Sequence, residues 1–459
     1  MPKRFLTFAL SLALLLTSAT SAAQPRETAA TPPLPPPETA GIPDTSADWR
    51  VAVQEDVRQG EYQVSSSSFG NRFLISPLDT PEAHEWYSSV AYNSQWQEYL
   101  VVWHASTAAN RYVYGQFLTR SGDPIGSRFM ISPPVGNNMY PDVAYDSNRN
   151  EYLVVYMVET ATPNVYGIYG VRLNAYGEWQ GSERCFAAPP TPPAGYTYWH
   201  PAVAYSTEAK EYLVTWQEDW GAAYKGIEAR TLPGDGGTLG AILEITGLQL
   251  NVAPSQPDVA YTPALDEFLV VWQRWYDGNY TDHDVMGQRI GLDSGAHLEG
   301  SAFPIYDTTS DEGSPAVGSV TRLSGVGEYL VACVYVYGSS AYIAGQLLTD
   351  AGALHDWAII SPYGGVIPAV AGNENTREFL VAWKYGANIQ ARTVNTSGGM
   401  GPYAQAMPYG SYPDWPAIAG GPPGNYLVTW HDQYPGYNFD VFGFLWGNRV
   451  FLPLVVRGS

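Results

Sequence analysis

Residues 98–103 read Glu-Tyr-Leu-Val-Val-Trp, and close variants of this hexapeptide return along the chain until there are seven copies. Successive copies begin 47 to 61 residues apart. A period in this range is typical of repeat architectures, in which each repeat is one supersecondary unit. The hexapeptide is β-branched and aromatic and too short for a helix, so it predicts one strand in every repeat. The copies start at Glu98, Glu151, Glu211, Glu267, Glu328, Glu378 and Asn425.

Three further segments accompany each hexapeptide. A short apolar segment precedes it, usually opened by proline as in residues 141–145, because proline is tolerated at the first position of a strand. Polar turn residues between the two favour a hairpin. A third segment centres on a glycine such as Gly115, which predicts close approach of a neighbouring backbone or side chain, with the tryptophan that ends the hexapeptide as one candidate. A fourth follows at residues 128–132, so each unit reads as four antiparallel strands.

Four-stranded sheets repeated about an axis predict an all-β fold, a seven-bladed β-propeller of antiparallel blades. An open stack of repeats is disfavoured because no polar capping repeat stands at either end. Residues 70–77 match the fourth strand at 126–133, yet no other strand precedes them. We therefore expect an N-terminal strand to complete the last blade and close the ring, which removes an exposed edge. Residues 447–453 also resemble a fourth strand and compete for the same edge.

The N-terminus predicts export from the cell. Residues 1–23 carry Lys3 and Arg4, then the apolar run 8–16 and small residues, the pattern of a secretory signal peptide. Residues 24–49 are rich in proline and read as a disordered spacer, which leaves residues 50–459 for the propeller. No other stretch approaches twenty apolar residues, so we expect no membrane span. The predicted location is extracellular or at the cell surface.

The charge balance is strongly acidic. The chain has 23 basic and 44 acidic residues and a net charge of −21, which becomes −23 without Lys3 and Arg4. This composition argues against nucleic acid as a partner, because phosphate binding needs Lys and Arg. It is compatible with divalent cations or cationic partners. The two cysteines, Cys185 and Cys333, fall in different repeats, and we expect both to be buried thiols too far apart to bridge.

No compact catalytic motif is present: there is no His-Glu-x-x-His pair, Gly-x-Ser-x-Gly elbow, phosphate loop or dinucleotide fingerprint. The position just after the hexapeptide nevertheless holds His104 in the first repeat and His431 in the last. A closed ring makes these repeats neighbours, so the two histidines are candidates for a metal or ligand site. The alternative is that both simply cap strand ends, since paired histidines define a site only with suitable geometry.

The loop after the fourth hexapeptide, residues 273–284, is the longest of its kind. It offers oxygen ligands from Asp277, Asn279, Asp282 and Asp284, a spacing similar to that of calcium loops. The complete EF-hand pattern is missing, so a solvated acidic loop is the alternative. No cofactor other than calcium is expected.

Aromatic residues follow the third and fourth hexapeptides, and their loops should lie on one face of the ring. Aromatic faces stack on sugar rings, so these residues predict a glycan-binding rim. The alternative is that they cover the ends of the blade cores. They are Trp220, Tyr224, Trp275, Tyr276 and Tyr280.

The repeated Pro-x-Val-Ala-Tyr and Glu-Tyr-Leu-Val-x-Trp segments, with a Gly-Gln-Arg strand at 287–289, resemble repeats of secreted bacterial β-propeller proteins. The resemblance spans residues 87–446 and implies the architecture, without catalytic residues to transfer. The sialidase box Ser-x-Asp-x-Gly-x-x-Trp and the paired Gly-His and Trp-Asp of WD40 blades are absent.

These observations favour a secreted, monomeric, non-catalytic propeller that binds a polysaccharide or a surface protein. One alternative is a carbohydrate-active hydrolase or lyase in which carboxylates from different blades meet at the central channel. Another is a purely structural surface protein. Fold analogy cannot choose among them, because propellers serve all three roles.

Overall fold

In the computed structural model, each hexapeptide forms the first part of a strand that is buried along most of its length. Tyr99, Leu100, Val101, Val102 and Trp103, for example, are all fully buried. Side chains on both faces of this strand are covered because every sheet is packed between two neighbouring sheets. The unbroken apolar run of the hexapeptide, in place of strict alternation, follows from this two-sided burial.

The structure describes residues 72–76, 84–106, 110–189, 196–221, 224–250, 252–276, 279–293, 295–321, 325–349, 357–406, 412–422, 424–433 and 439–447, except for the side chains of 276, 279–281 and 406. The predicted signal peptide, the proline-rich spacer and the competing strand from 448 onward lie outside these residues.

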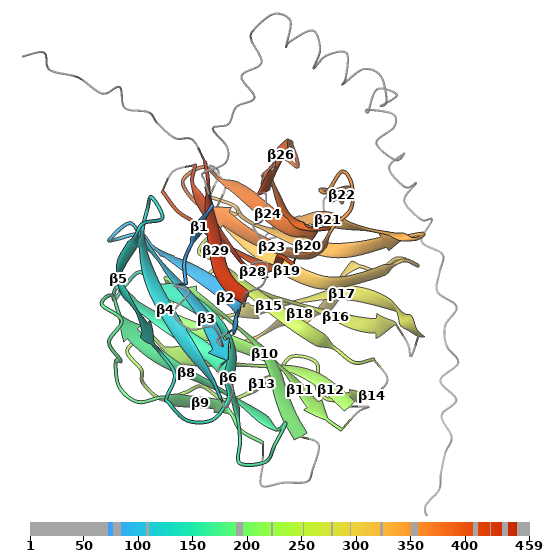
Figure 1. Cartoon of the computed structure of the whole chain (residues 1–459). Coiled ribbons are helices and arrows are strands. Elements are labelled where there is room, and N and C mark those ends of the chain that lie inside the picture. The colour runs from blue at the N-terminus through green and yellow to red at the C-terminus, as the bar shows by residue number, and fades with distance from the viewer. Residues whose placement is uncertain are drawn as a thin grey trace, which may run out of the picture. The chain divides into compact units, whose positions relative to one another are not determined.

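The described residues form seven antiparallel sheets, six of four strands and one with an additional short strand, and the chain is a seven-bladed β-propeller (Figure 1). Blade 1 contains β2 (His84–Asn93), β3 (Glu98–Ser106), β4 (Arg111–Thr119) and β5 (Pro124–Met130). Blade 2 contains β6 (Asn138–Asp146), β7 (Glu151–Glu159), β8 (Tyr166–Asn174) and β9 (Arg184–Ala187). Blade 3 contains β10 (Tyr196–Ser206), β11 (Glu211–Trp220), β12 (Tyr224–Pro233) and β13 (Leu243–Glu244), and β14 (Gln249–Leu250) also pairs with β12.

The remaining blades repeat this order. Blade 4 contains β15 (Ser255–Thr262), β16 (Glu267–Tyr276), β17 (Asn279–Gly291) and β18 (His297–Tyr306). Blade 5 contains β19 (Asp311–Thr321), β20 (Gly327–Tyr337), β21 (Ser340–Thr349) and β22 (Ala358–Ile359). Blade 6 contains β23 (Val366–Asn373), β24 (Glu378–Tyr385), β25 (Asn388–Asn395) and β26 (Met400–Ala406). Blade 7 contains β27 (Asp414–Gly420), β28 (Tyr426–Gln433) and β29 (Phe439–Trp446), and it takes its outer strand from the other end of the chain.

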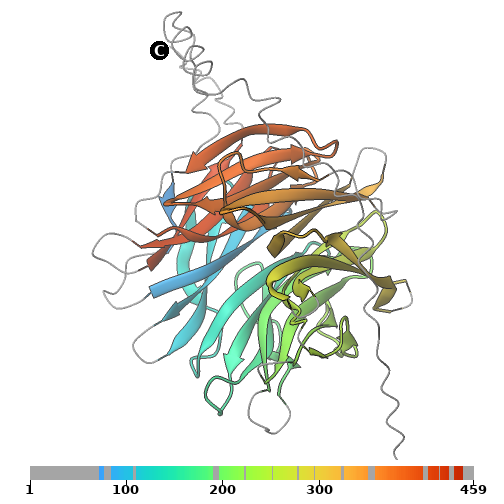
Figure 2. The same ribbon diagram turned by 90° about the vertical axis from the view of Figure 1, so that its right-hand side faces the viewer.

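That outer strand is β1 (Phe73–Leu74), which pairs antiparallel with β29, so the predicted closure of the ring is confirmed. The backbone amide of Ile75 also donates to the carbonyl of Val441 at 2.9 Å. Blue N-terminal and red C-terminal strands consequently lie side by side in both views (Figure 2). Hydrogen bonds between the two ends of the chain hold the ring shut and leave no open seam.

A β-bulge interrupts the innermost strand of every blade. The register between the first two strands shifts at the same place in all seven sheets, as between Trp86 and Ser89. In six blades the second bulged residue is the proline of the sequence repeat, so proline lies within the strand and does not open it as predicted. The bulge tolerates proline because a residue without an N–H fits where the hydrogen-bond ladder is already broken.

The first bulged residue has a left-handed backbone in all seven blades, with φ between 49° and 54°. None of the seven is glycine, and such a conformation costs a residue with a side chain about 1–3 kcal/mol. The bulge turns these side chains toward one mouth of the central channel. They are Tyr87, Tyr140, His200, Gln256, Ser314, Ile367 and Trp415.

Two aspartates in the channel wall tie blades together. Asp142 of β6 accepts hydrogen bonds from the Ser89 hydroxyl at 2.6 Å and from the backbone amide of Val203 at 2.8 Å. These donors belong to the blades on either side. Asp258 of β15 accepts from the amide of Val317 in the next blade at 2.8 Å. Both carboxyl groups therefore act as links between innermost strands.

The predicted close approach to the recurring glycine is confirmed, and the neighbour is the outer strand, whereas the tryptophan was the candidate named from the sequence. A Cβ atom on Gly115 would lie 2.8 Å from Cδ1 of Ile131, and one on Gly443 would lie 2.8 Å from Cδ1 of Ile75. Since an isoleucine side chain of the fourth segment folds over the third strand at this point, only glycine leaves enough space.

The predictions for the cysteines are half right. Cys333 is a buried free thiol, as expected, whereas Cys185 is free but exposed. Cys185 lies on β9, the outer edge strand of blade 2, where no further strand covers it. Within the described part of the chain, no helix is long and apolar enough to cross a membrane.

The closing strand provides a test of the ring. Ile75 is 4% exposed and packs on Gly443, so Ile75→Ala should lower the free energy of unfolding by about 2–5 kcal/mol. Urea denaturation measures this change. Leu74→Ala is the matched control, because Leu74 is 39% exposed and should change stability by less than about 0.5 kcal/mol. Equal effects of the two substitutions would contradict closure by this strand.

Candidate functional site

In four of the seven blades, the strained bulge is held by the side chain that follows the hexapeptide in the preceding blade. His431 Nδ1 accepts from the backbone amide of Tyr87 at 3.3 Å, and His104 Nδ1 accepts from that of Tyr140 at 3.4 Å. A glutamine plays the same part at two other junctions, where Gln273 Oε1 accepts from Ser314 at 2.7 Å. Where the position after the hexapeptide is histidine or glutamine, its side chain therefore caps the bulge of the next blade.

Four consecutive bulge residues form a continuous aromatic arc, which consists of Trp415, Tyr87, Tyr140 and His200. Ring centroids lie 5.1 Å apart for Trp415 and Tyr87, 4.4 Å for Tyr87 and Tyr140, and 5.6 Å for Tyr140 and His200. The other three blades place glutamine, serine and isoleucine at this position. Half of the channel mouth is thus aromatic and the other half is not.

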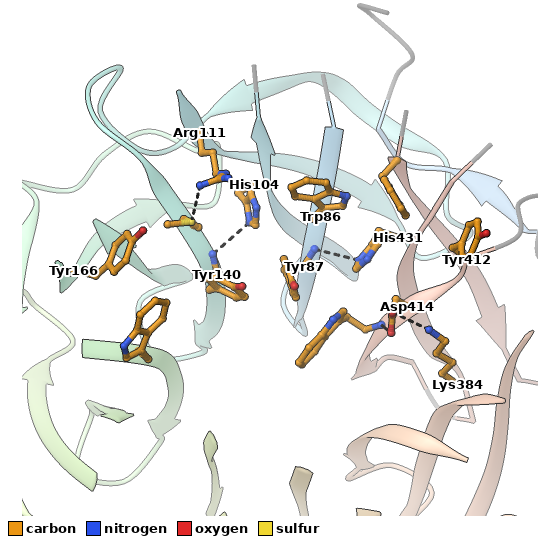
Figure 3. Close-up of a pocket in the computed structure, with 14 residues that line it drawn as sticks. Trp86, Tyr87, His104, Arg111, Tyr140, Tyr166, Lys384, Tyr412, Asp414 and His431 are labelled. Carbon is orange, nitrogen blue, oxygen red and sulfur yellow. Dashed lines mark hydrogen bonds and ion pairs between the residues drawn. The ribbon is translucent and has the colours of Figure 1, made fainter. Parts of the chain in front are cut away.

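A cavity of about 510 Å³ is lined by three members of this arc, Trp415, Tyr87 and Tyr140 (Figure 3). This volume lies in the range of small-ligand sites. Its lining comes from blades 6, 7, 1, 2 and 3, and more than half of it is aromatic. We call it the mouth cavity; it is lined by Trp86, Tyr87, His104, Arg111, Met139, Tyr140, Tyr166, Trp199, Lys384, Tyr412, Asp414, Trp415, His431 and Phe439.

Three charged groups line the mouth cavity. The Lys384 ammonium donates to the Asp414 carboxylate at 2.8 Å, and each side chain is about one-quarter exposed. The third charged group, Arg111, lies at the other end of the view in Figure 3. Asp414 is the only carboxylate among the described lining residues.

The two histidines of the mouth cavity are held neutral. Burial lowers the pKa of His104 to about 3, and the nearby charge of Arg111 adds to this effect. Burial also lowers the pKa of His431 to about 4. Because each Nδ1 accepts a backbone amide, each neutral ring carries its proton on Nε2 and offers a hydrogen-bond donor there.

The structure brings the two predicted histidines to one site, on either side of Tyr87. The Tyr87 ring stacks on His104 at 5.5 Å between centroids and lies 5.5 Å from His431 at a tilt. Both alternatives from the sequence therefore describe these residues in part, since each histidine caps a bulge and also lines the cavity. A metal or ligand held by them stays a prediction.

The predicted aromatic rim does not join the mouth cavity. Trp220 and Tyr224 are partly exposed at the hairpin between β11 and β12 of blade 3, with ring centroids 5.7 Å apart. Trp275 lies in the next blade and contacts His283 at 5.9 Å. The side chains of Tyr276 and Tyr280 lie outside the described residues. Glycan binding at this rim stays a prediction.

Two of the four predicted calcium ligands meet a third carboxylate. Asp282, Asp284 and Glu312 are buried, and one oxygen from each lies within 4.8 Å of the others. Glu312 belongs to the innermost strand of the next blade, which a search of one loop could not reveal. Asp277 and the side chain of Asn279 lie outside the described residues. Calcium at this cluster stays a prediction.

Sequence reasoning missed the aromatic arc, although a signal was present. The residue before the repeated proline is aromatic in Tyr140, His200 and Trp415, but glutamine, serine or isoleucine elsewhere. Comparing this position across repeats, as was done for the histidines, points to the same blades. What the sequence did not show is the bulge that turns these side chains into the mouth.

No family model matches the sequence, and no curated protein matches it. Among solved structures, a protein of unknown function from Dyadobacter fermentans DSM 18053 is 13% identical, with 83% of this chain and 99% of that chain covered and a TM-score of 0.52. An α-L-arabinofuranosidase from Fusarium graminearum, in complex with an iminosugar inhibitor, is also 13% identical, with 83% and 98% covered and a TM-score of 0.49. An α-L-arabinanase from Penicillium chrysogenum, complexed with arabinobiose, is 12% identical, with 83% and 98% covered and a TM-score of 0.45.

The prediction of a non-catalytic binding protein is corrected by these comparisons, because the neighbours with this coverage include arabinofuranosidases and an arabinanase. The alternative of a carbohydrate-active hydrolase or lyase agrees with them better. At such low identity the likeness itself shows the fold alone, so the chemistry has to be argued from the residues of this chain.

Buried carboxyl groups predict how stability depends on pH. Burial raises the pKa of Glu85 and Glu228 to about 7 and that of Glu312 to about 8. The folded chain therefore binds more protons than the unfolded chain, and its stability falls as pH rises through these values. The two buried histidines, His104 and His431, act in the opposite direction only below their unfolded pKa of about 6.5. We expect a lower melting temperature at pH 8.5 than at pH 6.5.

The variant Glu312→Gln keeps the neutral form of this side chain at every pH. Its melting temperature should fall less than that of the unmodified chain between the same two pH values. Equal pH dependence in both proteins would show that Glu312 is ionised in the folded state at pH 6.5 already.

Proposed function

We propose that this chain is a secreted carbohydrate-active enzyme that cleaves a polysaccharide in the mouth cavity. The observation that carries the proposal is one cavity in which an aromatic arc, neutral imidazoles and a lysine-bound carboxylate face the same space. Aromatic faces bind the apolar faces of sugar rings, and hydrogen-bond donors fix their hydroxyl groups. Secretion rests on the predicted signal peptide at residues 1–23.

Cleavage of a glycosidic bond requires one group that takes a proton and one that gives a proton. Asp414 is the candidate for the first role, because it is the carboxylate of the described lining and the Lys384 ammonium fixes it in place. Tyr87 and Tyr140 are candidates for the second role, since their hydroxyl groups carry protons beside the same cavity. Burial raises the pKa of Tyr87, which keeps its hydroxyl protonated at neutral pH and also makes it a weaker acid.

The proposal predicts that the purified chain releases reducing ends from a polysaccharide. A panel of arabinan, galactan, xylan and polygalacturonate is suitable, because hydrolysis and elimination both create a new reducing end. Asp414→Asn should reduce the rate about 100-fold or more, which is the usual contribution of a positioned acid or base. The thermal melting of the variant shows whether it is folded.

Glu208→Gln is the matched control. Glu208 is an exposed carboxylate between β10 and β11, at the end of blade 3 remote from the bulges, and its loss should leave the rate unchanged. Full activity in Asp414→Asn would remove Asp414 from the mechanism. A lack of cleavage across neutral and acidic polysaccharides would contradict the proposed function.

A further inference from the structure

Arg111 is the charged side chain of the mouth cavity that has no carboxylate partner among the described residues. Its guanidinium donates to the sulfur of Met139 at 3.4 Å, which is a weak acceptor. The charge of Arg111 contributes to the lowered pKa of Glu159, but the Glu159 oxygens accept from Asn137 Nδ2 at 2.5 Å and from the amide of Asn164 at 2.8 Å. Most of the five N–H donors of Arg111 therefore remain available to a ligand.

His104 lies beside Arg111 and adds a second donor. The charge of Arg111 is felt by His104, and Figure 3 shows the two side chains next to each other. Since His104 Nδ1 accepts from the backbone of Tyr140, its Nε2 is the protonated nitrogen. A cation and a neutral donor at one end of the cavity are complementary to an anionic oxygen pair.

The rest of the mouth cavity carries no net charge that opposes an anion. Lys384 and Asp414 neutralise each other at 2.8 Å, and both histidines are neutral. The described lining therefore has an excess of one positive charge, that of Arg111, within a chain whose net charge is −21. This positive charge attracts an anionic group of a ligand into the cavity, whereas the net negative charge of the chain repels anions elsewhere.

We infer that the mouth cavity binds an acidic sugar, with its carboxylate or sulfate ester against Arg111 and His104 and its ring against the aromatic arc. This inference rests on the proposed function and narrows its substrate class to acidic polysaccharides. Arg111 is here a specificity-determining residue, and Asp414 keeps the proton-transfer role at the other end of the cavity.

Calorimetry with three probes tests the inference: trigalacturonate, a sulfated galactan trisaccharide and neutral galactotriose. At least one acidic probe should bind about 10- to 100-fold more tightly than galactotriose, the range given by hydrogen bonds to a charged group. Arg111→Gln should remove this preference, so that the acidic and neutral probes bind with similar affinity. Arg111→Lys should retain part of it, because the charge remains while the planar fork is lost.

Arg120→Gln is the matched control, since Arg120 is an exposed arginine near the β4–β5 turn and donates to Gln97 outside the cavity. The acidic probe whose affinity depends on Arg111 identifies the anion. Equal binding of acidic and neutral probes, or an unchanged preference in Arg111→Gln, would overturn the inference. If the chain cleaves arabinan or galactan but binds neither acidic probe, the inference fails while the proposed function stands. If the chain cleaves no polysaccharide, the proposed function fails, and with it the inference that rests on it.

Discussion

The left-handed bulge in the innermost strand is the constraint on which the site depends. A regular strand would alternate its side chains between the two faces of a blade and bury both in the neighbouring blades. The bulge breaks this alternation and sends one side chain per blade into the channel mouth. At four of the seven bulges, the backbone strain of about 1–3 kcal/mol is offset by a hydrogen bond to a side chain of the preceding blade, such as His431 for Tyr87. Function and blade-to-blade cohesion therefore share the same residues.

Seven equivalent bulges allow the ring to be asymmetric without any change of fold. Replacing the bulged side chain alters the mouth and leaves the blade cores intact, because that side chain points away from them. Blades 7, 1, 2 and 3 use this freedom for the aromatic arc, and blades 4, 5 and 6 do not. The caps vary in parallel: histidine holds the bulges of Tyr87 and Tyr140, and glutamine holds those of Gln256 and Ser314.

The sequence predicts the fold well because the period of the hexapeptide directly reflects one blade. The closing strand could also be predicted, because residues 73–76 repeat the pattern of residues 129–132 without the other strands of a blade before them. The site was harder to predict, because its parts come from five blades and no local spacing connects Arg111 with Asp414. The histidines were found by comparing equivalent positions, whereas the rim around Trp220 was inferred from aromatic density alone and lies outside the cavity.

Comparing equivalent positions of the repeats also shows where two pairs of buried acids occur. Asp284 precedes Gly287 by three residues as Asp440 precedes Gly443, and Glu312 precedes Ser314 by two as Glu85 precedes Tyr87. These two positions, one on the third strand of a blade and one on the innermost strand of the next blade, are thus both acidic at two junctions. The junctions are those of blades 4 and 5 and of blades 7 and 1. At the other five junctions neither position is acidic.

In both pairs the neighbouring carboxylate adds to the effect of burial in raising the pKa of the glutamate. Two buried carboxyl groups side by side cannot both ionise without a counter-charge, and each junction supplies an arginine. Arg128 lies 2.8 Å from Glu85, and Arg274 lies 3.6 Å from Asp284. At each of these two junctions, the two acids and the arginine therefore occur together.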